Sequence, residues 1–406
     1  MKKINIGIIR EGKVPPDKRV ALMPDQCVEV QQKYPNLSVF IQPSDIRAFS
    51  NKEYAEKGLT LTEDLSHCDV LFGIKEVPIH LLIPDKTYFF FSHTLKKQPY
   101  NQKLLQAVLE KKIKLIDYEV LTDVQGNRLI AFGKFAGIVG AYNALLLYGK
   151  REKRYKLKPA YKCFDLQEVL SELRKVSLGA VKIVVTGRGR VGNGAKLILE
   201  QVGVKQVSPK DFLSKDFQEA VFSLVSSEDY YHEINNAEFN RDAFHKNPQN
   251  YTSTFIGFAK VADILIAGAY WDPQSPKLFE REDLQRVDFK IKIVADITCD
   301  INGSIPSTIK PSTIYDPAYD YNPFTYSIEP LFSGQENITV MAIDNLPGEL
   351  PRDASRDFGG QLIAQIFPLI STGNDPEGIL SRGAMTTNTG ILTEQFNYLG
   401  DYVNRN

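Results

Sequence analysis

A glycine-rich turn near the middle of the chain restricts most strongly what the sequence can fold into. The apolar segment Val181 to Thr186 leads into Gly187-Arg-Gly189-Arg-Val-Gly192, and apolar residues at helical spacing follow. In a G-x-G-x-x-G turn the first glycine makes the bend, the second lets the backbone approach a pyrophosphate, and the third packs helix on strand. The motif therefore predicts a dinucleotide-binding unit, with a purely structural glycine turn as the alternative.

The residues after this turn bear on the choice of cofactor. An acid about 20 positions further on usually holds the ribose of NAD, but this chain reads Val207-Ser208-Pro-Lys210-Asp211 there. Ser208, with Lys210 and Arg190 nearby, suits a 2′-phosphate better than an acid would. We therefore expect NADP(H), with NAD(H) as the alternative. The predicted cofactor-binding residues are Gly187, Arg188, Gly189, Arg190, Val191, Gly192 and Ser208.

Short apolar segments alternate with helical patterns along most of the chain, which is typical of α/β proteins with parallel sheets. Two series of strands are expected, and together they predict two Rossmann-like domains with mostly parallel sheets. The apolar stretch Ile130 to Gly149 is interpreted as a buried helix rather than a membrane span. The segment from Lys310 to Ser333 is expected to be an irregular, ordered loop. The strands are expected at Ile4–Ile9, Val39–Ile41, Val70–Phe72, Tyr88–Phe91, Leu115–Asp117, Val181–Thr186, Val204–Val207, Ile264–Ile266, Ile291–Ala295 and Thr339–Ile343.

Composition excludes several classes of function. The 406 residues include 49 Lys plus Arg and 49 Asp plus Glu, so no overall basic field favours nucleic acid or an anionic membrane. The four cysteines are widely spaced, which indicates neither a disulfide framework nor a zinc ribbon and fits a reducing cytoplasm. The histidines form no zinc-binding motif, so no metal is predicted.

Two polar side chains follow neighbouring apolar segments. Lys75 comes just after Val70–Phe72, and His93 comes just after Tyr88–Phe91. Loops at the carboxyl ends of parallel strands share one edge of a sheet, so these two side chains can converge as a proton-transfer pair. A surface lysine and a packing histidine are the alternatives, and Glu119 and Arg128 have the same two interpretations.

Several stretches together carry a resemblance to a known family. They are Ile74-Lys-Glu-Val-Pro78, Phe90-Phe-Ser-His-Thr-Leu-Lys96, Leu115-Ile-Asp-Tyr-Glu119, Ala131-Phe-Gly-Lys-Phe-Ala-Gly137 and Ala342-Ile-Asp-Asn-Leu-Pro347. The chain resembles the lysine-forming saccharopine dehydrogenases, and above all the lysine:2-oxoglutarate reductase half of aminoadipic semialdehyde synthase, within the alanine dehydrogenase and transhydrogenase-like superfamily. The resemblance implies interconversion of saccharopine with lysine and 2-oxoglutarate by imine formation and hydride transfer.

The same resemblance implies roles for individual residues. The family's catalytic lysine and histidine fall on Lys75 and His93. Its acids fall on Glu76 and Glu119, and its carboxylate-binding arginines fall on Arg19 and Arg128. Two further residues that line the family's crevice fall on Lys96 and Asp344. A departure is Asn127, which precedes Arg128 where fungal members have a second arginine.

The resemblance also implies a discontinuous domain. Residues 1–136 pair with 345–406 as the substrate domain, residues 137–344 form the dinucleotide-binding Rossmann domain, and the active site lies in an interdomain cleft. Two alternatives to this function stay open. One is another amino-acid dehydrogenase of the superfamily, such as an alanine dehydrogenase, which the loss of an arginine at Asn127 favours. The other is a non-catalytic nucleotide-sensing protein.

Overall fold

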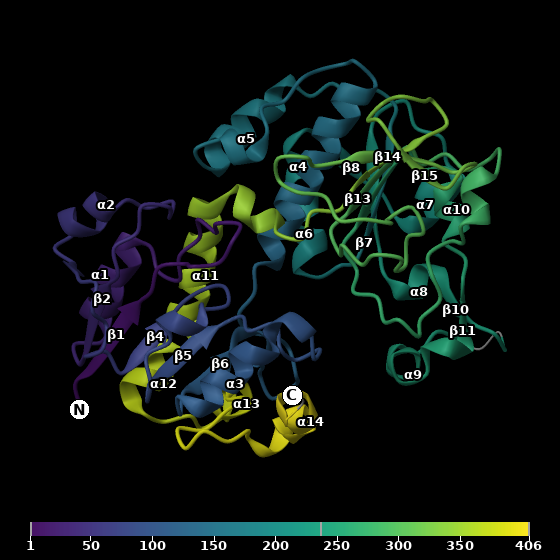
Figure 1. Cartoon of the computed structure of the whole chain (residues 1–406). Helices are drawn as coiled ribbons and strands as arrows, with labels where there is room; N and C mark the ends of the chain where they lie inside the picture. The colour runs from purple at the N-terminus through teal and green to yellow at the C-terminus, as the bar shows by residue number, and fades with distance from the viewer. Residues whose placement is uncertain (1, 236–237, 405–406) are drawn as a thin grey trace. The chain divides into compact units, whose positions relative to one another are not determined.

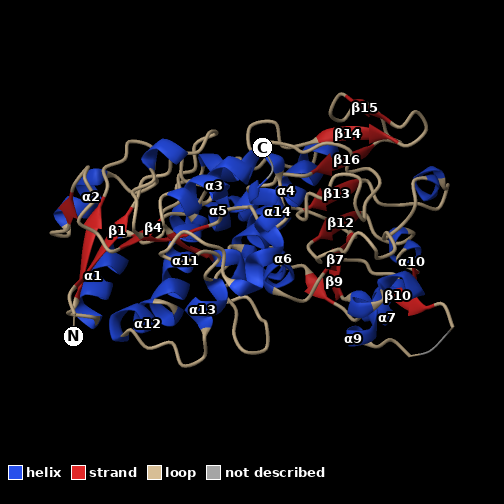
Figure 2. Ribbon diagram, turned by 60° about the horizontal axis from the view of Figure 1, so that its bottom comes forward, coloured by secondary structure: helices blue, strands red, loops and turns tan. Residues whose placement is uncertain are grey.

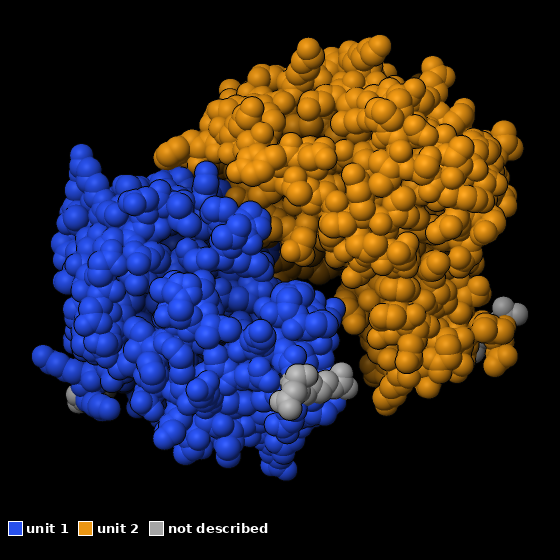
Figure 3. All heavy atoms as spheres, in the orientation of Figure 1, with its two compact units in different colours: residues 1–132, 351–406 blue, residues 133–350 orange. Residues whose placement is uncertain are grey.

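The chain divides into two compact units in the computed structural model, which describes residues 2–235 and 238–404. Unit 1 contains residues 1–132 and 351–406, and unit 2 contains residues 133–350 (Figures 1 and 3). Each unit is built on its own sheet. The predicted α/β class with two sheets is confirmed.

Unit 1 is built on a parallel sheet of 6 strands in the order β3-β2-β1-β4-β5-β6. Its strands are β1 (Ile4–Ile8), β2 (Leu37–Ile41), β3 (Thr60–Leu61), β4 (Val70–Phe72), β5 (Thr87–Phe90) and β6 (Lys114–Asp117). Its helices are α1 (Pro24–Lys33), α2 (Asn51–Glu56), α3 (Gln102–Glu110), α11 (Pro351–Gln365), α12 (Phe367–Thr372), α13 (Ile379–Gly383) and α14 (Gly400–Asn404).

Both faces of this sheet are buried, as a parallel sheet requires. Side chains alternate along each strand, so Phe72 and Phe89 pack into one core while Leu71 and Tyr88 pack into the other. The first core includes residues of α1, α11 and α12, and the second includes residues of α3. The segment after residue 351 therefore completes the core that the first 132 residues begin.

Unit 2 is built on an 8-stranded sheet in the order β15-β14-β16-β13-β12-β7-β9-β8 (Figure 2). The strands are parallel from β16 to β8, and β14 and β15 add antiparallel partners at one edge. The bounds of the strands in this sheet are β7 (Lys182–Thr186), β8 (Lys205–Gln206), β9 (Val221–Val225), β12 (Ile264–Ala267), β13 (Ile293–Asp296), β14 (Tyr319–Asn322), β15 (Ser327–Glu329) and β16 (Ile338–Met341).

A short antiparallel pair, β10 (Tyr231–Glu233) and β11 (Tyr251–Ser253), forms a second, separate sheet in unit 2. The helices of this unit are α4 (Gly133–Arg151), α5 (Leu166–Glu172), α6 (Arg190–Gln201), α7 (Pro209–Ser214), α8 (Ser227–Tyr230), α9 (Arg241–Lys246) and α10 (Ile256–Ala259).

Helix α4 is the long apolar segment of the sequence, and it is buried almost throughout inside unit 2. It packs closely on α6, because a methyl group at Gly137 would overlap the backbone carbonyl of Val191, and one at Gly194 would overlap that of Lys134. Within the part of the chain that the structure describes, no helix is both long and apolar enough to cross a bilayer.

The segment from Lys310 to Ser333 is not wholly irregular, which corrects the prediction. It contains the β14–β15 hairpin, in which Tyr319 and Tyr321 are buried and pair with β16. Strand pairing compensates the backbone polar groups of this segment, as burial requires.

Candidate active site

The carboxyl ends of four adjacent strands in unit 1 carry the candidate site. Strands β1, β4, β5 and β6 are neighbours and parallel, so the residues that follow them lie along one edge of the sheet. Glu11 and Lys13 follow β1, Lys75 and Glu76 follow β4, His93 follows β5 and Glu119 follows β6.

The carboxylate of Glu76 lies at the centre of a chain of ionic contacts. It accepts from the Nζ of Lys13 at 2.7 and 2.8 Å and from the Nδ1 of His93 at 2.8 Å, and the amide of Asn101 reaches it at 3.3 Å. Burial alone would raise the pKa of Glu76, but the hydrogen bonds from His93 and Lys13 outweigh it and lower the pKa to about 2. Glu76 is therefore a fixed negative charge that orients the imidazole.

The backbone at His93 is unusual and well supported. Its backbone φ is +49°, in the left-handed region that few residues other than glycine adopt. The amide of Asn101 donates to the carbonyls of Ser92 and His93 at 3.0 and 3.3 Å, and the backbone N–H of Ser92 donates to Asp117 at 2.8 Å. These bonds hold the turn that directs the imidazole toward Glu76.

Glu11 fixes the backbone that carries Lys75. Its two carboxylate oxygens accept from the N–H groups of Ile74 and Lys75 at 2.7 and 2.8 Å. Burial, reinforced by the nearby carboxylate of Asp17, raises the pKa of Glu11 to about 8. Lys75 itself is half-buried, and its charge contributes to keeping the pKa of Asp17 low.

The two predicted arginines each pack over a phenylalanine ring. Arg19 is 3% exposed, makes a bidentate ion pair with Asp17 at 2.6 and 3.0 Å, and lies 4.2 Å from the ring centre of Phe132. The guanidinium of Arg128 lies 5.3 Å from the ring centre of Phe91, and the imidazole of His93 stacks on that same ring at 6.3 Å. Phe91 and Phe132 are themselves 6.1 Å apart, so the contacts link both arginines to the His93 cluster.

The other predicted substrate-binding residues are placed differently. Glu119 is half-buried at the end of β6, where its N–H donates to Asp117 at 2.8 Å. Lys96 is exposed in the segment after His93. Asp344 is exposed after β16 and belongs to unit 2. Asn127 is exposed and donates to Asp123 at 2.9 Å within its own turn.

The glycine turn of unit 2 joins β7 to α6, as the motif predicts. Gly187 has a φ of +93°, and a methyl group at Gly192 would overlap the carbonyl oxygen of Gly187, so both positions require glycine. Around Gly189 the space is open, with no atom within 4 Å of an added methyl group. Helix α6 begins here, and the first-turn N–H groups of a helix have no carbonyl partner within it. The turn thus fits a pyrophosphate.

The remaining predicted cofactor residues have local partners. Arg188 pairs with Glu228 and Asp229 at 2.8 Å each, while Arg190 and Val191 are in the first turn of α6. Ser208 caps α7 by accepting from the N–H of Asp211 at 3.1 Å. Among the residues that the structure describes, no three His, Cys, Asp or Glu side chains converge to hold a metal ion.

The sequence reasoning missed four members of the unit 1 cluster. Glu11 and Lys13 follow β1 just as Lys75 follows β4, so the rule that selected Lys75 also applies to them. Asp17 lies two positions before Arg19, a spacing that allows the local ion pair. Asn101 carries no sequence signal, because its contacts depend on the packing of a turn before α3.

The chain is similar to several known proteins. Residues 7–139 match the alanine dehydrogenase/PNT N-terminal domain family. The mitochondrial alpha-aminoadipic semialdehyde synthase of Mus musculus is 30% identical over 407 residues, which cover 89% of this chain and 44% of that protein. Saccharopine dehydrogenase (NAD+, L-lysine-forming) of Neurospora crassa is 25% identical, with 89% and 90% covered. A solved L-alanine dehydrogenase superposes with a TM-score of 0.66 at 15% identity, covering 98% of this chain and 100% of that one.

The fold is that of L-alanine dehydrogenase, and the first third of the chain matches the alanine dehydrogenase/PNT N-terminal domain family, so the chain is similar to amino-acid dehydrogenases of that superfamily. Its sequence relatives include the alpha-aminoadipic semialdehyde synthases and the saccharopine dehydrogenases, which confirms the predicted resemblance. The chain spans less than half the length of the mouse synthase that it matches.

Proposed function

We propose that this chain is an oxidoreductase that interconverts saccharopine with L-lysine and 2-oxoglutarate, using a nicotinamide cofactor. The observation that carries the proposal is the Lys13–Glu76–His93 ionic chain beside Lys75, at the carboxyl edge of a parallel sheet. The sequence relatives named for saccharopine and aminoadipic semialdehyde chemistry support the choice of substrate class.

His93 is well arranged to exchange a proton with a substrate. Because ionised Glu76 accepts from Nδ1, the neutral imidazole carries its proton on that nitrogen and presents a basic Nε2. In the direction of saccharopine formation, a base must take protons from the ε-ammonium of lysine before the lysine nitrogen attacks the ketone of 2-oxoglutarate. We assign that proton transfer to His93 and Lys75.

The proposed reaction passes through an imine of lysine and 2-oxoglutarate. A C–N bond forms between the lysine nitrogen and the keto carbon of 2-oxoglutarate, and water leaves as the imine forms. A reduced nicotinamide, held at the glycine turn, would supply the hydride for this carbon, and a proton on the imine nitrogen completes the secondary amine of saccharopine. Substrates with several carboxylates need cations, and we assign Arg128 and Arg19 to them, with Glu76, Glu119, Lys96 and Asp344 as the remaining predicted substrate-binding residues.

The cofactor assignment has two parts. We propose that Gly187, Gly189 and Gly192 seat the pyrophosphate, since an open Gly189 and the start of α6 suit it. The expectation of NADP(H) depends on Ser208 and Lys210, and the name of the Neurospora crassa relative specifies NAD+ for that protein. The cytoplasmic location stays a prediction, because the mouse relative is mitochondrial.

The test is to mix the purified chain with lysine, 2-oxoglutarate and reduced cofactor, and to follow nicotinamide absorbance with mass detection of saccharopine. Lys75→Met and His93→Asn should each lower kcat by about 100-fold or more. Asparagine is chosen because it tolerates the positive φ at that position. Lys103→Met, an exposed lysine on α3, is the matched control and should be unchanged.

Two results would contradict the proposal. Turnover of pyruvate and ammonia without turnover of lysine would favour the alanine dehydrogenase alternative. The smaller substrate of such an enzyme needs only one carboxylate-binding group, and Asn127 supplies no second one. Cofactor binding without turnover of any amino acid would favour the nucleotide-sensing alternative.

A further inference from the structure

The strand beside the glycine turn is not the one that sequence order suggests. The chain runs from β7 through α6 to β8, but β8 lies at the edge of the sheet, and β9 lies between β8 and β7. In dinucleotide-binding folds the ribose is read by a residue at the end of the strand next to the glycine turn. In this chain that strand is β9, so the segment to consider begins at Ser226 rather than at Ser208.

The end of β9 contacts the glycine turn directly. The N–H of Gly187 donates to the carbonyl of Val225 at 2.7 Å. The guanidinium of Arg188 donates to Glu228 and to Asp229, each at 2.8 Å. The carboxylates after β9 therefore lie beside the turn that is proposed to hold the pyrophosphate.

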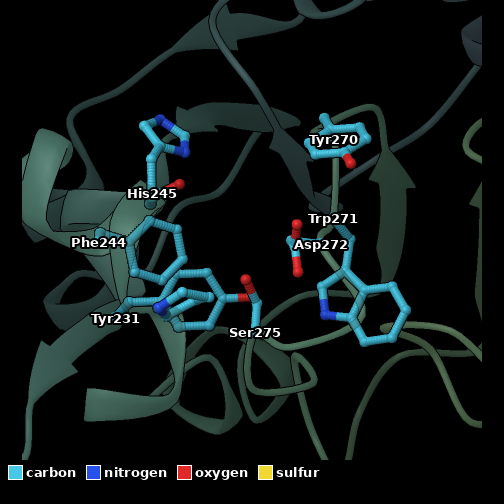
Figure 4. Close-up of a pocket in the computed structure, with 9 residues that line it drawn as sticks. Tyr231, Phe244, His245, Tyr270, Trp271, Asp272 and Ser275 are labelled. Carbon is cyan, nitrogen blue, oxygen red and sulfur yellow. The ribbon is translucent and has the colours of Figure 1, made fainter. Parts of the chain in front are cut away.

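A small pocket adjoins the same segment (Figure 4). Tyr231 and Phe244 lie on one side, and Tyr270 and Trp271, from the loop after β12, lie on the other. Ser227 also lines the pocket. That loop also contacts the end of β7 just before the glycine turn, because the hydroxyl of Thr186 accepts from the N–H groups of Gly268 and Ala269 at 3.2 and 3.3 Å. The pocket thus lies between the ends of the two strands that flank β7, and aromatic side chains can stack on a purine.

We infer that Glu228 accepts the ribose 2′-hydroxyl of the cofactor, that the adenine occupies the pocket of Tyr231, Phe244 and Tyr270, and that the chain therefore selects NAD(H) over NADP(H). This inference rests on the proposed dehydrogenase function, and it reverses the cofactor preference expected from Ser208.

Glu228 is assigned rather than Asp229 because of their local contacts. The Oδ2 of Asp229 accepts from the backbone N–H of Ser226 at 2.7 Å and closes the capping box of α8, so Asp229 holds the loop. The side chain of Glu228 is 41% exposed, against 18% for Asp229. Glu228 is the carboxylate that an incoming hydroxyl can reach.

The charges at this position disfavour a 2′-phosphate. Both terminal nitrogens of Arg188 are paired with carboxylates, and Arg241 lies 3.5 Å from the second oxygen of Glu228. A phosphate would have to displace these carboxylates and then lie close to them, which is electrostatically costly. A hydroxyl needs only an acceptor, which a carboxylate supplies.

The experiment uses the fluorescence of Trp271, the one tryptophan in the sequence, while the chain is titrated with ADP-ribose or with 2′-phospho-ADP-ribose. Calorimetry with the same two ligands measures affinity independently of the fluorescence change. ADP-ribose should bind at least about tenfold more tightly, the scale of one hydrogen bond to a charged group.

Variants locate the discrimination. Glu228→Ser should remove the preference by weakening ADP-ribose binding and strengthening binding of its 2′-phosphate. Glu219→Ser, which removes the same charge at the amino end of β9, is the matched control and should keep the preference. Ser208→Ala tests the competing assignment and should also keep it.

Each result decides the matter. Tighter binding of the 2′-phosphate, an unchanged preference in Glu228→Ser, or binding of neither ligand overturns the inference. Selective binding of ADP-ribose without lysine turnover leaves the inference standing and rejects the proposed reaction. Lysine turnover together with a preference for the 2′-phosphate supports the proposed reaction and overturns the inference about Glu228.

Discussion

Replacing Glu11 by glutamine should change how the stability of the chain depends on pH. The pKa of Glu11 rises from 4.5 to about 8 because the carboxyl group is buried and faces Asp17. At about 1.4 kcal/mol for each pH unit, ionising Glu11 costs the folded state about 5 kcal/mol. Between those two pKa values the folded state binds more protons than the unfolded state, so the free energy of unfolding falls as pH rises through that window.

The glutamine variant removes this titration and adds a different cost. Glu11 accepts from two backbone N–H groups, and an amide offers only one acceptor oxygen, so one N–H of Ile74 or Lys75 would face a donor. An unsatisfied buried donor costs about 1–3 kcal/mol. The variant should therefore be less stable than the parent near pH 5 and more stable above about pH 8, with the two curves crossing near pH 6.

Urea unfolding followed by circular dichroism, at several values from about pH 5 to pH 9, measures both curves. Glu110→Gln, an exposed glutamate on α3, is the control and should follow the parent at every pH. A constant difference between Glu11→Gln and the parent across the range would refute the argument that burial keeps Glu11 protonated at neutral pH.

Four further substitutions test other parts of the structure. Gly192→Ala should lower the free energy of unfolding by about 1–3 kcal/mol, because the added methyl group meets a backbone carbonyl. Gly189→Ala should preserve the fold but weaken cofactor binding, since the space around Gly189 is open. Equal stabilities of the two variants in urea would contradict this. Asp17→Asn should cost about 3–5 kcal/mol by removing the charged partner of the buried Arg19, and an unchanged melting temperature would count against it. Because the pKa of Glu76 is lowered from 4.5 to about 2, the parent chain should lose stability as the pH falls from 4.5 toward 2. Glu76→Gln should abolish this loss, which acid unfolding measures.

Most strands could be predicted from the sequence, because buried parallel strands are short apolar runs. Val70–Phe72 agrees residue for residue with β4, and Val181–Thr186 differs from β7 by one residue. The β14–β15 hairpin was harder to predict, since the proline and tyrosine density around it is typical of a loop, although Tyr319 and Tyr321 alternate with polar residues as in a strand.

The order of strands across a sheet is less accessible to sequence. The expected strand Val204–Val207 exists only as the two-residue β8, and its place at the edge depends on how β9 returns to β7. Counting residues from the glycine turn therefore leads to Ser208, whereas the hydrogen bond from Gly187 to Val225 leads to the segment after β9.

In the candidate site, the pairing of His93 with Glu76 could be anticipated only in part. Both residues follow adjacent strands, which places them on one edge, but the contact itself requires the positive φ at His93. That conformation is maintained by Asn101 from outside either strand, which no local pattern indicates.

The ion pairs between Arg188 and the residues after β9 have an evolutionary consequence. Glu228 lies in the first turn of α8, outside the apolar core of unit 2, so its loss would leave the sheet intact. If Glu228 reads the ribose as we infer, a single codon change there moves a descendant of this chain from one nicotinamide pool of the cell to the other without remodelling its scaffold. Under that inference, lineages with different redox demands should diverge first at the start of α8.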